Sequence, residues 1–322
     1  MIVNIFWNQA ENRLRAGWRV LIHALAISLP ILILGALGFY TRPGIQVEAW
    51  VVLTALPLTL LVTWLAGRYL DKRLFSDFGV LLRQARWWAE YGYGWLVGIL
   101  SAAGFVFLLV LLDYGVIGPA ARIDLSLMDL ITGIVISLLI YAGVGVFEEL
   151  MRVYQVRNIT EGLAPTRLRL FGAALVAVLV GGAYSLIMHI PGRDLSLPYL
   201  FYILVTGSIY GLFYVWTGRA ALAMAFHAAW DFAVTNIFAL GGATGGEAAI
   251  FSVPLHSLTG TEETLYHFLG LAGKVICLVL VVLWVYWREG RLRIKADIAQ
   301  PTLRVEEGHH PAQPHEFSIK SS

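Results

Sequence analysis

The chain has 322 residues, of which 58% are hydrophobic and only 14% are charged, with a mean hydropathy of +0.73. Soluble proteins are nearer a quarter charged, so this composition excludes a soluble globular protein and predicts a polytopic membrane protein surrounded by lipid. A formal net charge of +2 gives no reason to expect nucleic acid as a partner. Cys277 is the only cysteine, which excludes a disulfide within the chain.

Apolar stretches long enough to cross a bilayer recur along the chain. A bilayer core of about 30 Å needs about 20 apolar residues per helix. The sequence therefore predicts an all-α integral membrane protein of about eight transmembrane helices. The predicted spans are 18–40, 49–68, 94–117, 129–152, 169–190, 197–217, 220–240 and 266–287.

Three regions follow from this pattern. Residues 1–93 hold the first two spans and a segment, 70–93, in which charges alternate with Leu, Phe and Trp, a composition typical of a helix lying in the membrane interface. Residues 94–287 form a core of six spans. Residues 288–322 are polar and predict a disordered tail. Its three histidines admit a metal-binding interpretation, but tails of this composition need no function; they are His309, His310 and His315.

Lysine and arginine gather on one side of the membrane if the eight spans alternate. The loops on the other side contain only Arg42, Arg122 and Arg193. The positive-inside rule then places both termini in the cytoplasm. We expect a multi-pass protein of the cell membrane. The first span follows several arginines and is too long for the core of a signal peptide, so we expect it to be retained.

Two adjacent carboxylates and an arginine interrupt the fourth span. They are Glu148, Glu149 and Arg152. A carboxylate inside a membrane helix costs at least about 2.5 kcal/mol, so the pair predicts a functional site. On a helix Arg152 can reach either carboxylate, while the two glutamates point about 100° apart and cannot share one role. The alternative is a plain ion pair at the end of a span.

Two histidines and an aspartate in later spans are candidates to join this pair. His189 ends the fifth span, where an interfacial residue is the alternative to a proton shuttle or metal ligand. His227 and Asp231 lie four apart on one helix face, among alanines that let neighbouring helices come close. Their alternative is a hydrogen bond that joins helices. His23 and Lys274 are also within spans, but they have no patterned partner and are expected to be structural.

Together these residues resemble the three sequence motifs of one family. Glu148-Glu149 with Arg152, then His189, then His227-Ala-Ala-Trp-Asp231 are similar to the motifs of the CPBP intramembrane proteases. That group includes CAAX prenyl endopeptidases of the Ras-converting type and bacteriocin self-immunity (Abi) proteins. The resemblance covers about residues 140–240.

Two positions depart from the family's usual pattern. The first motif reads EExxR instead of EExxxR, which rotates Arg152 by about 100° on its helix. The second motif is normally FxxxH, and here Ser185 stands in place of the phenylalanine while His189 is retained. Asp231 replaces the asparagine often found in the third motif, a variation within the family's pattern.

The resemblance implies an endopeptidase that acts on a membrane-associated peptide or protein, prenylated substrates included. It implies that Glu148 and His189 hold and activate a water that attacks a peptide carbonyl, with support from Glu149 and Arg152. A glutamate is a credible general base. Two rival functions remain open. One is a catalytically silent scaffold or immunity factor of the same fold, and the other is a proton-coupled transporter with a Glu/His relay, although no inverted repeat is evident.

The same resemblance implies that His227 with Asp231 stabilises the oxyanion or completes a metal site. Histidine can donate to an oxyanion, whereas an ionised Asp231 suits the orientation of His227 or the binding of a metal. Glu148, His189 and His227 together would make a three-ligand site for a divalent metal such as Zn²⁺. No HExxH spacing is present, so the metal stays open.

The predicted spans leave one geometric difficulty. They place Glu148 at one end of the fourth span and His189 near the opposite end of the fifth, yet a shared site needs them within a few ångström. Either the fourth helix continues through residues 158–162, or Gly181 and Gly182 break the fifth helix beside a water-filled cavity.

Overall fold

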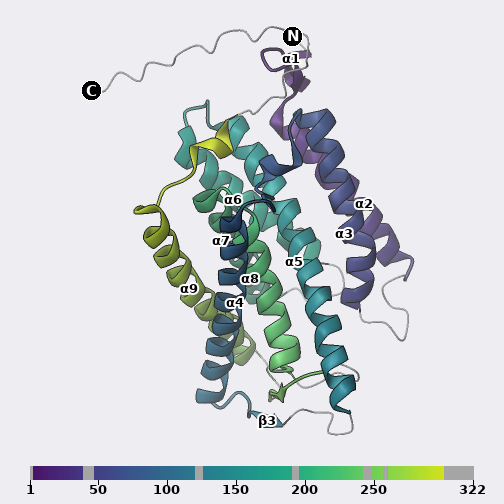
Figure 1. The fold of residues 1–322 in the computed structure, drawn as a ribbon, viewed down its shortest axis with the longest axis vertical. Coiled ribbons are helices and arrows are strands. Elements are labelled where there is room, and N and C mark those ends of the chain that lie inside the picture. The colour runs from purple at the N-terminus through teal and green to yellow at the C-terminus, as the bar shows by residue number, and fades with distance from the viewer. Residues whose placement is uncertain are drawn as a thin grey trace.

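Long helices make up most of the computed structural model, which describes residues 3–38, 47–119, 126–190, 196–241, 248–256, 258 and 260–300. Seven of the described helices are long and apolar enough to cross a membrane. The predicted all-α polytopic membrane fold is thus confirmed (Figure 1). These helices are α2 (Ala16–Ala36), α3 (Val47–Leu65, continued by the π-helical turn η2, Ala66–Asp71), α4 (Ala85–Leu111), α5 (Leu127–Leu163), α6 (Arg169–His189), α7 (Leu197–Thr217) and α9 (Thr261–Glu289).

Short elements close the two ends of the bundle. At one end lie the first helix, a small hairpin and a 3-10 turn after α9; at the other, two short strands pair antiparallel (Figure 1). The orientation of these ends across the membrane stays a prediction. The short elements are α1 (Val3–Phe6), β1 (Trp7–Asn8), β2 (Arg13–Leu14), η5 (Ala296–Ala299), β3 (Gly118–Pro119) and β4 (Phe251–Ser252).

The stretch predicted as the seventh span, 220–240, forms a short helix instead. It consists of α8 (Ala221–Phe232) and the π-helical turn η4 (Ala233–Ile237). The 12 residues of α8 rise only about 18 Å, too little to cross a bilayer core of about 30 Å. All of them except Asp231 are buried, because α8 packs against α4, α5 and α7 inside the bundle (Figure 1).

Small residues let the neighbours of α8 approach it closely. A Cβ added at Gly98 on α4 would lie 2.5 Å from the Cβ of Ala229, and one at Gly145 on α5 would lie 3.0 Å from the Cβ of Ala228. These distances are shorter than van der Waals contact, so no side chain larger than hydrogen fits. The alanines of α8 therefore do allow the close helix contacts expected from the sequence.

Helix α5 runs without a break from Leu127 to Leu163, a total of 37 residues, and α6 is also continuous through Gly181 and Gly182. The fourth helix therefore continues well beyond the predicted end of its span, and the fifth helix is not broken. Glu148 lies about 22 Å from the C-terminal end of α5. This depth brings it level with the last turns of α6 and resolves the geometric difficulty.

The structure differs from the interfacial helix predicted for residues 70–93. This stretch contains the end of η2, the 3-10 turn η3 (Phe75–Phe78) and the start of α4. Two of its charged residues, Asp71 and Arg73, are buried in an ion cluster, in which Glu161 pairs with three arginines. Burial lowers the pKa of one of them, Arg73, to about 9. Charges that pair inside the protein cannot anchor a helix at the headgroups.

The first part of the predicted disordered tail is ordered. Ile298 is fully buried, the backbone N–H of Lys295 donates to the carbonyl of Val215 at 2.9 Å, and Arg157 Nη2 donates to the carbonyl of Asp297 at 3.1 Å. One apolar anchor and two backbone contacts thus hold η5 against α5 and α7. The rest of the tail, with its histidines, lies outside the described residues.

We expect Gly98→Ala to destabilise the protein, because the added methyl group forces α4 away from Ala229. Overpacking of this kind costs about 1–3 kcal/mol, measured as a lower thermal transition in detergent. Gly92→Ala on the same helix is the matched control, since a Cβ there meets nothing within 4 Å. Equal transitions for the two variants would contradict close packing of α4 on α8.

Candidate active site

The two carboxylates on α5 occupy different surroundings. The Glu149 side chain is 1% exposed, whereas that of Glu148 is 19% exposed and lines a cavity of about 120 Å³. Their directions differ because adjacent helical residues point about 100° apart. Only Glu148 can therefore meet a molecule in the cavity directly.

Glu149 is held by two cationic side chains. Arg152 Nη1 pairs with Glu149 Oε1 one turn along the same helix, and His227 Nδ1 lies 2.7 Å from the same oxygen. Hydrogen bonds to a charged acceptor are roughly twice as strong as neutral ones. This contact fixes α8 to α5 at the level of the cavity.

His227 lies among carboxylates on both sides of its ring. Its Nε2 is 3.3 Å from Asp231 Oδ2 and 3.8 Å from Glu148 Oε2, while Nδ1 faces Glu149. Carboxylates only accept hydrogen bonds, so this arrangement suits an imidazolium that donates from both nitrogens. The i, i+4 pair expected on α8 thus joins the glutamates of α5.

His189 faces the cavity from the last turn of α6. Its Nδ1 lies 2.8 Å from the carbonyl oxygen of Ser185. Because a carbonyl can only accept, Nδ1 carries the proton, and Nε2 of a neutral ring is left as an acceptor. The cavity is lined by five of the six side chains predicted from the sequence, with Glu149 directly behind them; the five are Glu148, Arg152, His189, His227 and Asp231.

The two departures from the family's pattern meet in space. Arg152 Nη2 donates to the hydroxyl of Ser185 on α6. A phenylalanine at position 185 would offer no acceptor to this guanidinium. The shifted arginine and the serine are therefore physically matched, and together they tie α5 to α6 beside His189.

Sequence reasoning missed Lys274 and Tyr210, which also line the cavity. Lys274 on α9 has no exposed surface, donates to the Tyr210 hydroxyl at 2.9 Å, and its Nζ lies 3.3 Å from the ring centre of Trp230. The signal for Lys274 was its charge within a span. No partner was visible, because Tyr210 is 64 positions away in the chain.

A divalent metal finds no ready set of ligands here. Among the described residues, no group of three or more His, Cys, Asp or Glu side chains is arranged to hold a metal ion. The cations Arg152 and Lys274 also line the cavity, and positive charge disfavours a divalent cation. The predicted ligand set Glu148, His189 and His227 therefore does not fit Zn²⁺ as it lies in this structure.

We expect Arg152→Met to lower stability strongly, because it leaves Glu149 buried without its closest cation. Removing one partner of a buried ion pair costs about 3–5 kcal/mol, seen as a lower thermal transition in detergent. The double variant with Glu149→Gln should recover part of the loss. Arg83→Met, at an exposed arginine, is the control. Additive losses in the double variant would contradict a direct pair.

Comparison with known proteins agrees with the motifs in this site. Residues 129–233 match the model of a family described as type II CAAX prenyl endopeptidase Rce1-like. No curated protein and no solved structure matches the chain significantly. The matched stretch contains all six predicted site residues and covers α5 through α8. This segment of the chain is therefore similar to the Rce1-like family of type II CAAX prenyl endopeptidases.

Proposed function

We propose that the protein is an intramembrane endopeptidase that hydrolyses a peptide bond in a membrane-associated peptide or protein. One observation carries the proposal: Glu148 and His189 line the same cavity with acceptor atoms available to a water. The family description suggests prenylated proteins among the substrates. A catalytically silent scaffold would not need hydrogen-bond acceptors that face a cavity.

The proposed reaction begins with a water held between Glu148 and His189 Nε2. Glu148 Oε2 lies 3.8 Å from His227, beyond hydrogen-bonding distance, so its oxygens can accept from the water. Glu148 takes a proton as the water oxygen attacks the peptide carbonyl carbon. The C–N bond of the resulting tetrahedral species then breaks, and the proton passes from Glu148 to the departing amine.

Negative charge on the carbonyl oxygen needs stabilisation in this low-dielectric site. Asp231 is unsuited, because a carboxylate cannot donate. We assign this role to the Tyr210 hydroxyl, which receives a hydrogen bond from Lys274 Nζ and so has its own proton free to donate. His227 acts as a positioning residue that holds Glu149 and Asp231.

A second cavity supports entry of an apolar substrate. It measures about 170 Å³ and also borders Glu148 and His189. Its other walls are mostly apolar, which suits a hydrophobic side chain next to the scissile bond. These walls include Ile31, Phe147, Met151 and Met188.

We expect the wild type to cleave some members of a panel of membrane-tethered and lipidated peptides in nanodiscs. Glu148→Gln and His189→Gln should each lower kcat/KM at least about 100-fold, since the first removes the base that takes the proton and the second removes the Nε2 atom that holds the water. The proposed mechanism uses no metal, so a chelator should leave the rate unchanged. Arg83→Met serves as the control.

The outcomes separate the candidate functions. No cleavage by a well-folded wild type would favour a silent scaffold. Inactivation by the chelator, restored by added Zn²⁺, would overturn the metal-free mechanism. Proton-coupled transport in proteoliposomes without cleavage would favour the transporter.

We expect Tyr210→Phe to lower kcat about 10²-fold or more with little change in KM, because an oxyanion donor acts only in the transition state. Lys274→Met should show the same split, since it removes the cation that polarises Tyr210. Steady-state kinetics on a peptide that the wild type cleaves measure both constants. A raised KM with unchanged kcat would mean that Tyr210 and Lys274 contribute to substrate binding and not to stabilisation of the transition state.

A further inference from the structure

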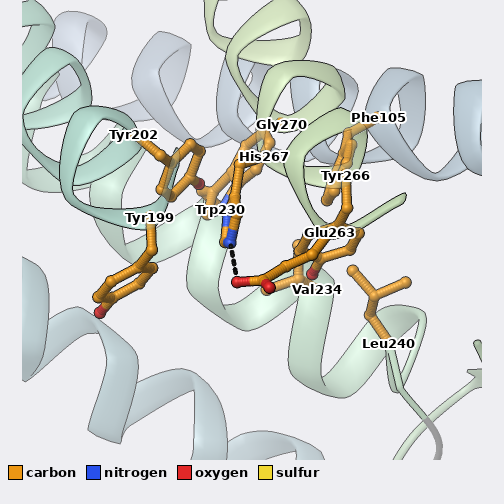
Figure 2. Close-up of a pocket in the computed structure, with 10 residues that line it drawn as sticks. All are labelled: Phe105, Tyr199, Tyr202, Trp230, Val234, Leu240, Glu263, Tyr266, His267 and Gly270. Carbon is orange, nitrogen blue, oxygen red and sulfur yellow. Dashed lines mark ion pairs between the residues drawn. The ribbon is translucent and has the colours of Figure 1, made fainter. Parts of the chain in front are cut away.

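A larger cavity of about 350 Å³ adjoins the candidate active site (Figure 2). It is lined by side chains from the first turns of α7 and α9, from α8 and from α4. Aromatic rings form most of its wall, and Glu263 is the single carboxylate among the described residues that line it. The aromatic residues are Phe105, Tyr199, Tyr202, Trp230 and Tyr266.

Glu263 has only weak compensation for its charge. Its Oε1 accepts a hydrogen bond of 2.7 Å from the Ser196 hydroxyl and lies 3.8 Å from His267 Nε2, the contact dashed in Figure 2. Its side chain is 40% exposed. Among the described residues that line this cavity, none is lysine or arginine. An anionic group thus faces the cavity without a permanent cation.

Aromatic faces and a carboxylate together recognise cations. An ammonium or guanidinium over a tyrosine or tryptophan ring is attracted by the ring's electrons, and the carboxylate adds a charge-assisted hydrogen bond. Trp230 already has Lys274 over its ring. A further cation would therefore meet the tyrosine side of the cavity, where the rings of Tyr199, Tyr202 and Tyr266 surround His267, the partner of Glu263 in Figure 2.

This aromatic cavity shares part of its wall with the cavity of the candidate active site. Tyr202 and Trp230 line both, and Trp230 directly precedes Asp231. Glu263 and Lys274 lie on the same helix, about 16 Å apart along its axis. An extended peptide covers that length in about five residues, so a substrate whose scissile carbonyl lies beside Lys274 in the candidate active site can place a side chain at Glu263.

We infer that this cavity binds a lysine or arginine side chain of the substrate, within about five residues of the scissile bond. The inference rests on the proposed endopeptidase function and adds a specificity to it. Interfacial tyrosines and tryptophans ordinarily contact lipid headgroups. Here the rings enclose a cavity with a carboxylate, next to the reacting centre.

The test compares peptides that carry Lys, its neutral isostere norleucine, or Glu at each of five positions on both sides of the cleaved bond. For wild type, Lys at one position should raise kcat/KM about tenfold or more over norleucine, as one charge-assisted contact provides. Glu263→Gln should abolish this preference while cleaving the norleucine peptide at the wild-type rate. Glu263→Lys should reverse it in favour of the Glu peptide.

Glu262→Gln is the matched control, because it removes the same charge one residue away at an exposed position that does not line the cavity. It should keep the preference for Lys. Cleavage without any preference in the wild type, or a preference that survives Glu263→Gln, would overturn the inference and leave the endopeptidase intact.

If no peptide is cleaved, the binding affinities of the peptides test the inference instead. Fluorescently labelled Lys peptides should still bind wild type about tenfold more tightly than norleucine peptides do. The Glu263→Gln variant should bind the two peptides with equal affinity. Equal binding of both peptides to wild type would overturn the inference. Competition by vesicles with amine headgroups but not by Lys peptides would assign the cavity to lipid instead, and would also overturn it.

Discussion

Neutralisation of charge inside an apolar bundle is the constraint on which this structure depends. An unpaired ion in a membrane interior costs several kcal/mol, so every charge brought into the centre needs a partner. Around the cavity, three carboxylates are met by three cationic groups once His227 is an imidazolium. The carboxylates are Glu148, Glu149 and Asp231, and the cations are Arg152, His227 and Lys274.

This balance of charges links three helices, α5, α8 and α9. His227 reaches Glu149 only because α8 is short, fully enclosed and built from alanines that meet glycines of α4 and α5. The ion pair and the close packing therefore depend on each other. A second buried ion cluster, centred on Glu161, fixes the other end of α5 to the N-terminal hairpin and to η2.

The order of the cavities around the site defines an orientation for a bound substrate. Glu148 and His189 lie between an apolar cavity beside α2 and a polar cavity that includes Lys274. Beyond the polar cavity lies the aromatic one with Glu263. A substrate that occupies all three would place an apolar residue on one side of the reacting water and a basic residue on the other, a combination typical of segments that begin in lipid and end at the membrane surface.

The sequence by itself determined the all-α membrane fold and pointed to the six residues proposed for the candidate site, because hydropathy and costly intramembrane charge are local signals. It did not determine that 220–240 folds as a short buried helix, since an apolar stretch reads the same whether lipid or protein covers it. Nor did it reveal that Arg152 bonds to Ser185 or that Lys274 bonds to Tyr210. Only the tertiary structure decided these pairs, because their members lie far apart in the chain and meet through helix packing alone.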